Sequence, residues 1–418
     1  MRRQRARRAW QSAALIIGLT AVVSGARGAQ KPEWPQFHGP RRDNMSTETG
    51  LLKQWPEGGP KLVWTAKGIG SGFSTVAIAG KRIYITGNIG DHTVIAALRL
   101  DGRSLWQARN GPACRHQHAG TRSTPTIEEH RLYHMNADGD LVCLDARTGR
   151  HLWGLNILKK FGGRNITWGL AESLLIDGDN VICTPGGQET GMVALNKITG
   201  TTVWTCTGTR DKPGYCSPTL FEHGGVRQIA VLMSRSVIGV NADTGNLLWQ
   251  EPHVCPFEEN ITAPLFHDGR LLISTRTTGT RLFELKTDGD RVTLKERWGT
   301  AALTNQHGGM LVVNGHIYGE CHGGQPWAVL DFGSGTTTYK GRGIGRASIT
   351  YADGRLYLLS FSGTMALVRP DPRTFAPVSQ FRVPKGGRGP FWAHPVVCGG
   401  RLYVRHDDTL FAYDIAER

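Results

Sequence analysis

Short apolar runs separated by glycine-containing turns recur along the chain. Examples are IAGKRIYI from residue 78, IDGDNVIC from residue 176, FHDGRLLI from residue 266 and YADGRLYL from residue 351. Each reads as two short strands joined by a tight turn, and no long amphipathic helical pattern accompanies them. Eight such turns, two of them degenerate, start near residues 79, 128, 177, 223, 268, 314, 353 and 399, so neighbouring copies lie 39 to 49 residues apart. This spacing is typical of a β-propeller with four strands in each blade.

A second phrase recurs between these turns. LDARTGRHLW, LNKITGTTVW and VNADTGNLLW each place Thr-Gly four residues before a tryptophan. We expect the Thr-Gly pair to form a hairpin turn after a third strand, and the tryptophan to lie on the outer fourth strand, where it packs against the next blade. Packing explains a repeated tryptophan better than ligand binding does, and this docking role is assigned to Trp64, Trp106, Trp153, Trp204, Trp249 and Trp298. The sixth copy ends in Tyr339, and an eroded seventh ends near Phe381.

The two ends of the chain complete the last blade. LFAYD, near the C-terminus, matches a third strand that lacks its fourth, whereas GPKLVW, ending at Trp64, matches a fourth strand without the first three. Pairing these segments would close the ring and remove exposed sheet edges. The sequence therefore predicts an all-β, eight-bladed β-propeller of four-stranded antiparallel blades over residues 60–418, closed by pairing of the N-terminal strand with the C-terminal strands. Residues 29–59 are predicted to form a Pro/Gly-rich N-terminal strap.

Residues 1–28 have the layout of a cleaved signal peptide. Five arginines within the first eight residues precede the apolar run AALIIGLTAVV and then small residues. The run is too short for the ~20 residues of a membrane-spanning helix, so we expect a periplasmic or secreted protein without a transmembrane helix after cleavage. The sequence does not choose between Sec and twin-arginine export. Cleavage lowers the formal charge from +15 to +9 (49 − 6 basic residues minus 34 acidic residues). The basic residues do not cluster in runs, so we expect no nucleic-acid partner.

Two groups of residues suggested further chemistry. Export permits disulfides among the eight cysteines, and Cys206 and Cys216, which flank a polar loop, are the best candidates for a bridge. In CRHQH, the residues Cys114, His116 and His118 alternate and would share one face of an extended strand. This arrangement is a weak candidate for a zinc or copper site because no fourth ligand is identifiable.

The repeated tryptophan phrases and the opening WPQFHGPRRDN resemble the PQQ-like (pyrroloquinoline quinone repeat) β-propeller family over essentially the whole mature chain. This resemblance implies the propeller fold but leaves two functions open, because function depends on sites rather than on the scaffold. Quinoprotein dehydrogenases of this family bind PQQ and calcium, whereas BamB-like members are non-enzymatic scaffolds of outer-membrane assembly. The adjacent cysteines of many quinoprotein alcohol dehydrogenases and the Cys-x-x-Cys-His haem motif are both missing from this sequence. PQQ is thus a cofactor implied by the resemblance only.

A ligand site, if one exists, is predicted at the mouth of the central channel. The segments that precede the innermost strands should meet there, and they carry aromatic, cationic, carboxylate and amide side chains. The candidate ligand-binding residues are Arg122, Trp168, Glu172, Tyr215, Asn260, Asn305, His307, Arg346, Trp392 and His394. Such a set would suit a planar anionic ligand held by stacking and charge-assisted hydrogen bonds. The alternative is a wet channel mouth without any ligand.

The leading functional hypothesis is a protein-binding, scaffolding propeller of the cell envelope, with outer-membrane or other envelope proteins as partners. We expect it to be a monomer and assign no catalytic residue. The alternative is a PQQ-dependent, quinoprotein-like oxidoreductase that uses the channel mouth. A third hypothesis is a binder of anionic glycans, which the basic surface would favour.

Overall fold

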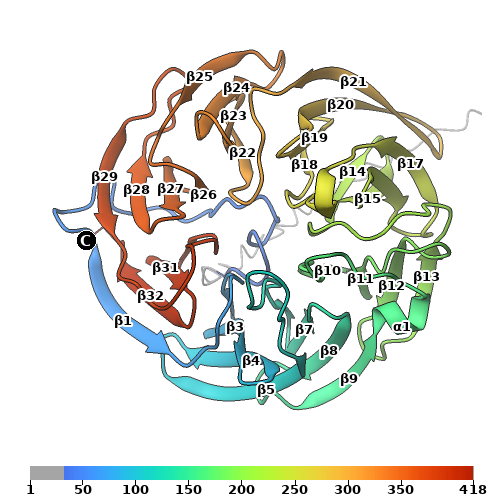
Figure 1. The fold of residues 1–418 in the computed structure, drawn as a ribbon, viewed down its shortest axis with the longest axis horizontal. Helices are drawn as coiled ribbons and strands as arrows, with labels where there is room; N and C mark the ends of the chain where they lie inside the picture. The colour runs from blue at the N-terminus through green and yellow to red at the C-terminus, as the bar shows by residue number, and fades with distance from the viewer. Residues whose placement is uncertain (1–32, 418) are drawn as a thin grey trace, which may run out of the picture. The chain divides into compact units, whose positions relative to one another are not determined.

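The computed structural model describes residues 33–417, and the predicted signal peptide lies outside this range. Within the described residues, eight four-stranded antiparallel sheets form a ring of propeller blades (Figure 1). Helical structure is confined to α1 (Ile157–Phe161) and a 3₁₀ turn (Pro256–Glu258) in this part of the chain. The predicted all-β, eight-bladed architecture is confirmed. No helix in residues 33–417 combines the length and hydrophobicity needed to cross a membrane.

The blades are numbered in chain order, and each is given from its innermost to its outermost strand. Blade 1 comprises β2 (Ala77–Ala79), β3 (Arg82–Ile89), β4 (His92–Arg99) and β5 (Ser104–Pro112), and blade 2 comprises β6 (Thr126–Glu128), β7 (Arg131–Met135), β8 (Asp140–Asp145) and β9 (His151–Asn156). Blade 3 comprises β10 (Leu175–Asp177), β11 (Asn180–Cys183), β12 (Met192–Asn196) and β13 (Thr202–Cys206), and blade 4 comprises β14 (Thr219–His223), β15 (Val226–Leu232), β16 (Ser236–Asn241) and β17 (Leu247–Pro252). Blade 5 comprises β18 (Leu265–His267), β19 (Arg270–Thr275), β20 (Gly279–Asp288) and β21 (Arg291–Thr300), and blade 6 comprises β22 (Met310–Val313), β23 (His316–Glu320), β24 (Trp327–Asp331) and β25 (Thr337–Gly341). Blade 7 comprises β26 (Ala347–Ala352), β27 (Arg355–Ser360), β28 (Thr364–Val368) and β29 (Pro377–Arg382), and blade 8 comprises β30 (Val396–Cys398), β31 (Arg401–His406), β32 (Thr409–Asp414) and β1 (Lys61–Lys67).

Blade 8 joins the two ends of the propeller. Strand β1 pairs antiparallel with β32, and Thr65 lies opposite Phe411 in this register. In Figure 1 the blue β1 therefore lies beside the red β32. The predicted closure by N- and C-terminal strands is confirmed, and it leaves β1 as the outermost strand of blade 8.

The repeated tryptophans contact the turn of the following blade. Trp106 of blade 1 donates its indole N–H to the carbonyl oxygen of Ala146 in blade 2, at 3.2 Å. A Cβ on Gly149, in the Thr-Gly turn of blade 2, would lie 2.6 Å from the Trp106 ring. Gly149 has a φ of 75°, so the turn needs glycine for its backbone as well as for this close approach. The same pair of contacts joins Trp64 to Leu100 and Gly102, Trp153 to Lys197 and Gly200, Trp204 to Ala242 and Gly245, and Trp298 to Phe332 and Gly335.

Trp249 differs from the other tryptophans. Its indole N–H donates to Gln228 Oε1 of its own blade at 2.9 Å, and its ring covers Gly239, also of blade 4. Blade 5 offers no Thr-Gly turn to receive it, because its β20–β21 hairpin is extended. The stacked rings of Phe221 and Phe266, 4.2 Å apart, link blades 4 and 5 instead.

Blade 7 has no tryptophan at the position of the repeat, and Trp55 of the strap packs there instead. In the registers of β8–β9 and β28–β29, Trp153 lies opposite Cys143, and Ser379 takes the corresponding place opposite Leu367, after the same β-bulge. The aromatic position is therefore Ser379 rather than the neighbourhood of Phe381. The ring of Trp55 packs 5.9 Å from Tyr357 at 55°, close to the 6.2 Å and 51° of the Trp153 ring on Tyr133 in blade 2.

The strap crosses the ring before it reaches blade 8. Trp34 bridges to Ile78 of blade 1, and Met45 bridges to Tyr351 of blade 7. Between these points, Arg42 donates to the carbonyl oxygen of Ser173 in blade 3 at 2.9 Å. The blue segment in Figure 1 accordingly runs through the middle of the ring. Residues 34–45 thus connect the innermost strands of blades that are not neighbours.

The predicted disulfide between Cys206 and Cys216 is absent: both cysteines are buried and neither forms a disulfide. Cys206 and Cys216 both belong to the apolar core that spans blades 3 to 5. Burial raises the pKa of Cys206 to about 11 and that of Cys216 to about 12, so both remain protonated thiols at neutral pH. Both side chains pack as small hydrophobic groups.

Candidate functional site

A cavity of about 390 Å³ lies among the segments that lead into the innermost strands. Every blade contributes to its wall from this segment, and the strap adds Phe37. The turns β19–β20 and β23–β24 add Arg276 and His322. The lining residues of the eight segments are Phe73, Thr75, Gln117, His118, Arg122, Trp168, Ala171, Ser173, Tyr215, Ser217, Glu259, Ile261, Gln306, His307, Arg346, Trp392 and His394. We call this space the axial cavity.

The structure brings together seven of the ten candidate ligand-binding residues. Those that line the axial cavity are Arg122, Trp168, Tyr215, His307, Arg346, Trp392 and His394. The other three, Glu172, Asn260 and Asn305, are buried and do not line it. Asn305 donates to the carbonyl oxygens of Gly309 and Glu320, and Asn260 donates to that of Met233. Through their side-chain nitrogens, these two amide groups hold the backbone in place.

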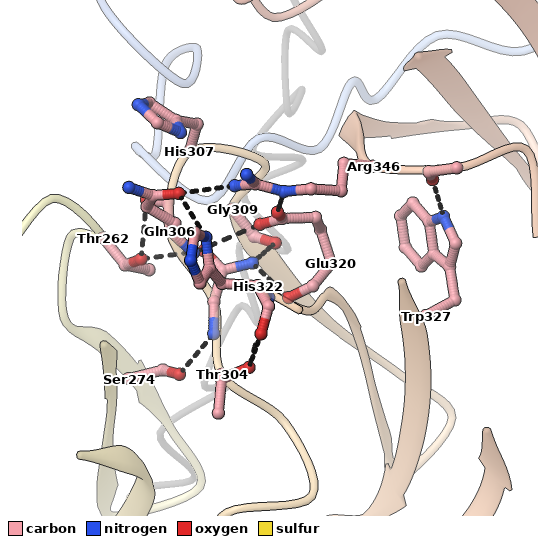
Figure 2. Close-up of polar contacts among 12 residues, drawn as sticks. Thr262, Ser274, Thr304, Gln306, His307, Gly309, Glu320, His322, Trp327 and Arg346 are labelled. Atoms are coloured by element: carbon pink, nitrogen blue, oxygen red, sulfur yellow. Dashed lines mark hydrogen bonds and ion pairs between the residues drawn. The ribbon is translucent and has the colours of Figure 1, made fainter. Parts of the chain in front are cut away.

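Gln306 joins the polar groups on one side of the axial cavity (Figure 2). Its Oε1 accepts from Arg346 Nη2 at 2.6 Å and from His322 Nδ1 at 2.8 Å. Its Nε2 donates to Glu259 Oε2 at 2.9 Å, and the same carboxylate forms an ion pair with Arg276 at 2.9 Å. One amide side chain thereby couples two arginines, a histidine and an acid from blades 5 to 7.

Arg346 also forms an ion pair with Glu320, whose side chain is fully buried. Burial raises the pKa of Glu320, and the neighbouring Arg346 opposes this shift. The guanidinium of Arg346 additionally lies 4.8 Å from the ring centroid of Phe361. The guanidinium of Arg346 therefore contacts the carboxylate of Glu320, the amide of Gln306 and the ring of Phe361.

An aromatic cluster forms another side of the axial cavity. Trp392 and His307 stack with their ring centroids 4.5 Å apart and their planes at 11°. Phe73 and His118 approach the same indole at 5.0 Å and 4.9 Å. Two buried nitrogens of this cluster, Trp392 Nε1 and His307 Nδ1, have no hydrogen-bond partner among the described residues. Because buried polar groups are nearly always satisfied, these atoms indicate unused binding capacity in the wall.

His394 connects this cluster to the strap. Its Nε2 lies 2.9 Å from the carbonyl oxygen of His307, and its Nδ1 lies 3.0 Å from the side-chain nitrogen of Asn44. Since a carbonyl only accepts, Nε2 carries the proton and Nδ1 accepts from Asn44. Burial lowers the pKa of His394 to about 4, so the ring is neutral at neutral pH. Burial and the charge of Arg346 likewise hold the pKa of His307 well below its usual value.

Arg122 organises the loop that carries the candidate metal ligands. Its guanidinium donates to Cys114 Sγ at 2.8 Å and to the carbonyl oxygen of His118 at 2.8 Å. The side chain of His116 instead lies 3.9 Å from Asp138, and that of His118 faces Trp392. The three predicted ligands therefore point to separate neighbours. In residues 33–417, no group of three or more His, Cys, Asp or Glu side chains is arranged to hold a metal ion.

Glu172 lies directly behind the wall, between the lining residues Ala171 and Ser173. Its Oε2 accepts from the backbone N–H and the hydroxyl of Thr184, whereas its Oε1 is buried without a partner in the described part of the chain. Burial raises the pKa of Glu172 to about 7. The Oδ1 of Asn260 is likewise buried and unpartnered there.

Four important contributors to the axial cavity were not among the candidates: Phe37, Arg276, Gln306 and His322. Gln306 lies in a segment that the sequence did place at the mouth, beside His307. Arg276 and His322 lie in hairpin turns, and Phe37 lies in the strap. The repeat assigns the segments before the innermost strands to the mouth but gives no information on the hairpin turns or the strap. The sequence therefore offered no signal for Phe37, Arg276 or His322.

Comparison with known proteins gives one family. The sequence profile of the family described as "Outer membrane protein assembly factor BamB" matches residues 45–189 and 168–337, which is more than half of the chain. A protein of that name from Salmonella typhimurium is 25% identical over 188 residues. That alignment covers 44% of this chain and 43% of the relative, so the chain matches less than half of the relative's length.

Solved structures of two functional kinds have the same fold. BamB from Moraxella catarrhalis aligns with a TM-score of 0.61 at 14% identity, over 86% of this chain and 98% of that chain. A quinohemoprotein alcohol dehydrogenase from Comamonas testosteroni aligns with a TM-score of 0.65 at 12% identity, over 94% of this chain and 82% of that chain. At such low identity these likenesses support the fold alone. The profile match over residues 45–337, together with the eight-bladed ring, places this chain in the outer membrane protein assembly factor BamB family of PQQ-like propellers.

Proposed function

We propose that this protein is an exported propeller of the cell envelope that binds and positions other envelope proteins. The observation that carries this proposal is the family match over residues 45–337. The signal-like residues 1–28 support export to the periplasm, and the tryptophans that contact neighbouring blades support a rigid scaffold for docking. In this proposal the protein acts as a monomer, and its partners are proteins of outer-membrane assembly.

The test is capture of the partner from native membranes. The full chain, expressed in its own cells with a C-terminal tag and cross-linked before lysis, should recover outer-membrane assembly proteins by mass spectrometry. An unrelated exported propeller with the same tag serves as the control. Recovery of the same proteins with both baits, or of none with this chain, would overturn the scaffold proposal.

A quinoprotein-like oxidoreductase is the second candidate, and the axial cavity favours it. Two buried oxygens beside the cavity, Glu172 Oε1 and Asn260 Oδ1, lack partners among residues 33–417, and carboxylate and amide oxygens are the ligands that calcium prefers. These two residues would hold the cation, and the arginines of the wall would face the carboxylates of PQQ. Bound PQQ would supply the two-electron acceptor for oxidation of an alcohol.

Reconstitution separates the two candidates. The purified protein is mixed with PQQ and calcium and then desalted, and the quinone absorbance retained per chain is measured. Stoichiometric retention that is lost in Glu172→Gln would support the oxidoreductase. Retention of no more quinone than an unrelated protein retains would rule out the oxidoreductase. Partner capture by Glu172→Gln should be unchanged if the protein is a scaffold.

A further inference from the structure

A second hollow lies between blades 7 and 8 and differs from the axial cavity in its charge. It has a volume of about 490 Å³, and its wall includes Phe361, Arg382, Lys385, Arg388, Phe391 and His406. We call it the blade 7–8 cleft. None of the described residues that line it is an acid.

The cations of the blade 7–8 cleft are not neutralised by ion pairs. The side chains of Lys385 and Arg388 make no hydrogen bond or ion pair with any residue in the described range, and Arg382 donates only to hydroxyl groups, including Thr364 Oγ1 at 3.0 Å. In the axial cavity, by contrast, Arg276 and Arg346 are each paired with a glutamate. Unpaired cations around a concave surface raise the local positive potential and favour an anionic ligand.

The loop that presents these cations is held in a fixed position. The buried ring of His406 accepts from the backbone N–H of Gly386 through Nδ1, at 2.8 Å, and donates through Nε2 to the carbonyl oxygen of Gly389, at 3.0 Å. The same ring stacks on Phe391 with centroids 3.8 Å apart. One buried imidazole thus holds the backbone at Gly386, directly after Lys385, and at Gly389, directly after Arg388.

Close packing fixes the middle of the loop as well. A Cβ on Gly386 would lie 2.4 Å from the Thr409 side chain, and a Cβ on Gly387 would lie 2.1 Å from Asp407. The carboxylate of Asp407 accepts from the backbone N–H of Arg388 at 2.9 Å, so it supports the loop and offsets part of the positive charge. Lys385 and Arg388 are therefore presented by an ordered loop and Arg382 by the end of β29, which lowers the entropy lost when a ligand binds.

We propose that the blade 7–8 cleft is a binding site for a phosphate-bearing ligand. Two guanidinium groups and one ammonium group can share the two negative charges of a phosphate monoester, and guanidinium forks match its oxygens in geometry. At Gly389, which lines the cleft, a Cβ would meet nothing within 4 Å, so a ligand has room to approach the backbone there. The ligand is either a soluble phosphorylated molecule or the headgroup of an anionic phospholipid. This proposal is independent of the scaffold role.

The test uses inorganic phosphate as the probe and ³¹P line broadening as the readout, with the full mature chain. The wild-type protein should broaden the phosphate resonance. The triple variant Arg382→Gln/Lys385→Gln/Arg388→Gln should bind about tenfold or more weakly. The control is Lys286→Gln/Arg291→Gln/Lys295→Gln, which removes the same charge from exposed positions on the β20–β21 hairpin and should bind like the wild type. Equal binding by all three proteins, or no broadening by the wild type, would overturn the proposal.

Two further arms make the result unambiguous. Lys385→Gln and Arg388→Gln alone alter side chains without partners in residues 33–417, so they should keep the wild-type melting temperature and still weaken phosphate binding several-fold. Flotation with phosphatidylglycerol vesicles, with phosphatidylcholine vesicles as control, distinguishes the two sources. Flotation that depends on the three cations identifies a lipid headgroup, whereas phosphate binding without flotation identifies a soluble ligand.

Discussion

At the scale of single residues, the blade contacts depend on glycines that have no space for a side chain. Gly149 and Gly178 both have positive φ values, 75° and 54°, in turns of blades 2 and 3. A Cβ on Gly149 would meet the Trp106 ring at 2.6 Å, whereas a Cβ on Gly178 would meet nothing within 4 Å. The two glycines therefore separate the energetic effect of the backbone conformation from that of the indole contact.

We predict that Gly149→Ala destabilises the fold more than Gly178→Ala does. Both substitutions place a Cβ in the left-handed region, at about 1–2 kcal/mol each. Only Gly149→Ala also displaces the Trp106 ring, which adds roughly 1–3 kcal/mol. Urea unfolding of the two variants measures the difference, and equal free energies of unfolding would show that the indole contact contributes nothing.

A second prediction concerns Arg346 and the buried Glu320. Arg346→Gln leaves the carboxylate without its cation, so we expect a loss of about 2–3 kcal/mol in the free energy of unfolding at pH 8. The native pKa of Glu320 is already raised by burial and should rise further in the variant. Because the native state then binds more protons than the unfolded state, the loss should shrink as the pH falls from 8 to 5. The double variant Arg346→Gln/Glu320→Gln should recover stability at pH 8, and a double variant as unstable as Arg346→Gln would contradict this account.

At the scale of elements, the strap replaces a missing part of the repeat. Blade 7 has Ser379 where other blades have an aromatic residue, and Trp55 packs on Tyr357 in the geometry of the in-blade tryptophans. The backbone N–H of Trp55 donates to Ser379 Oγ at 2.9 Å, so the serine also anchors the strap. The indole nitrogen of Trp55, however, is buried without a partner among the described residues. The strap supplies the apolar contact but not the hydrogen bond between blades.

We therefore predict coupling between Trp55 and Ser379. Trp55→Ala should reduce the free energy of unfolding by about 3–5 kcal/mol, the range for a large buried aromatic side chain. Ser379→Trp alone should also be destabilising, because Trp55 already occupies the space. In the double variant Trp55→Ala/Ser379→Trp, the blade would regain an indole in its own strand and recover part of the loss. Additive losses in a double-mutant cycle would refute the replacement.

The elements show what the sequence could and could not predict. The glycine turns and Thr-Gly phrases predicted the blades because their spacing is set by strand length, and the incomplete segments LFAYD and GPKLVW predicted the closure. Trp249 was grouped with the other tryptophans although its receiving turn is missing from blade 5, which a single phrase cannot reveal. Glu172, Asn260 and Asn305 were placed at the mouth with their segments, but side chains in an extended segment alternate in direction, and these three bond to backbone groups instead of lining the cavity.

At the scale of the whole molecule, several histidines are buried in a neutral state. Burial lowers the pKa of His134 to about 3 and the pKa values of His253 and His394 to about 4. In the unfolded chain these rings would titrate near 6.5. Between pH 4 and pH 6.5 the unfolded state therefore binds more protons than the native state, and the free energy of unfolding must fall as the pH falls.

We predict a marked loss of stability in mild acid. Each of these histidines should lower the free energy of unfolding by about 1.4 kcal/mol for each pH unit below 6.5. Chemical unfolding at pH 7 and pH 5 measures the slope. His134→Asn should reduce the slope by about 1.4 kcal/mol per pH unit relative to the wild type. A slope equal to that of the wild type would show that His134 is protonated in the native state.

The closure of blade 8 also has a consequence for synthesis of the chain. Thr65 of β1 lies opposite Phe411 of β32, so 346 residues must be made after the first strand before its partner exists (411 − 65). At about 5–20 residues per second, ribosomes need roughly 17–70 s for this length. Throughout that delay the backbone N–H and C=O groups of β1 lack their partner strand, so the segment is an unpaired edge that is open to pairing with another chain.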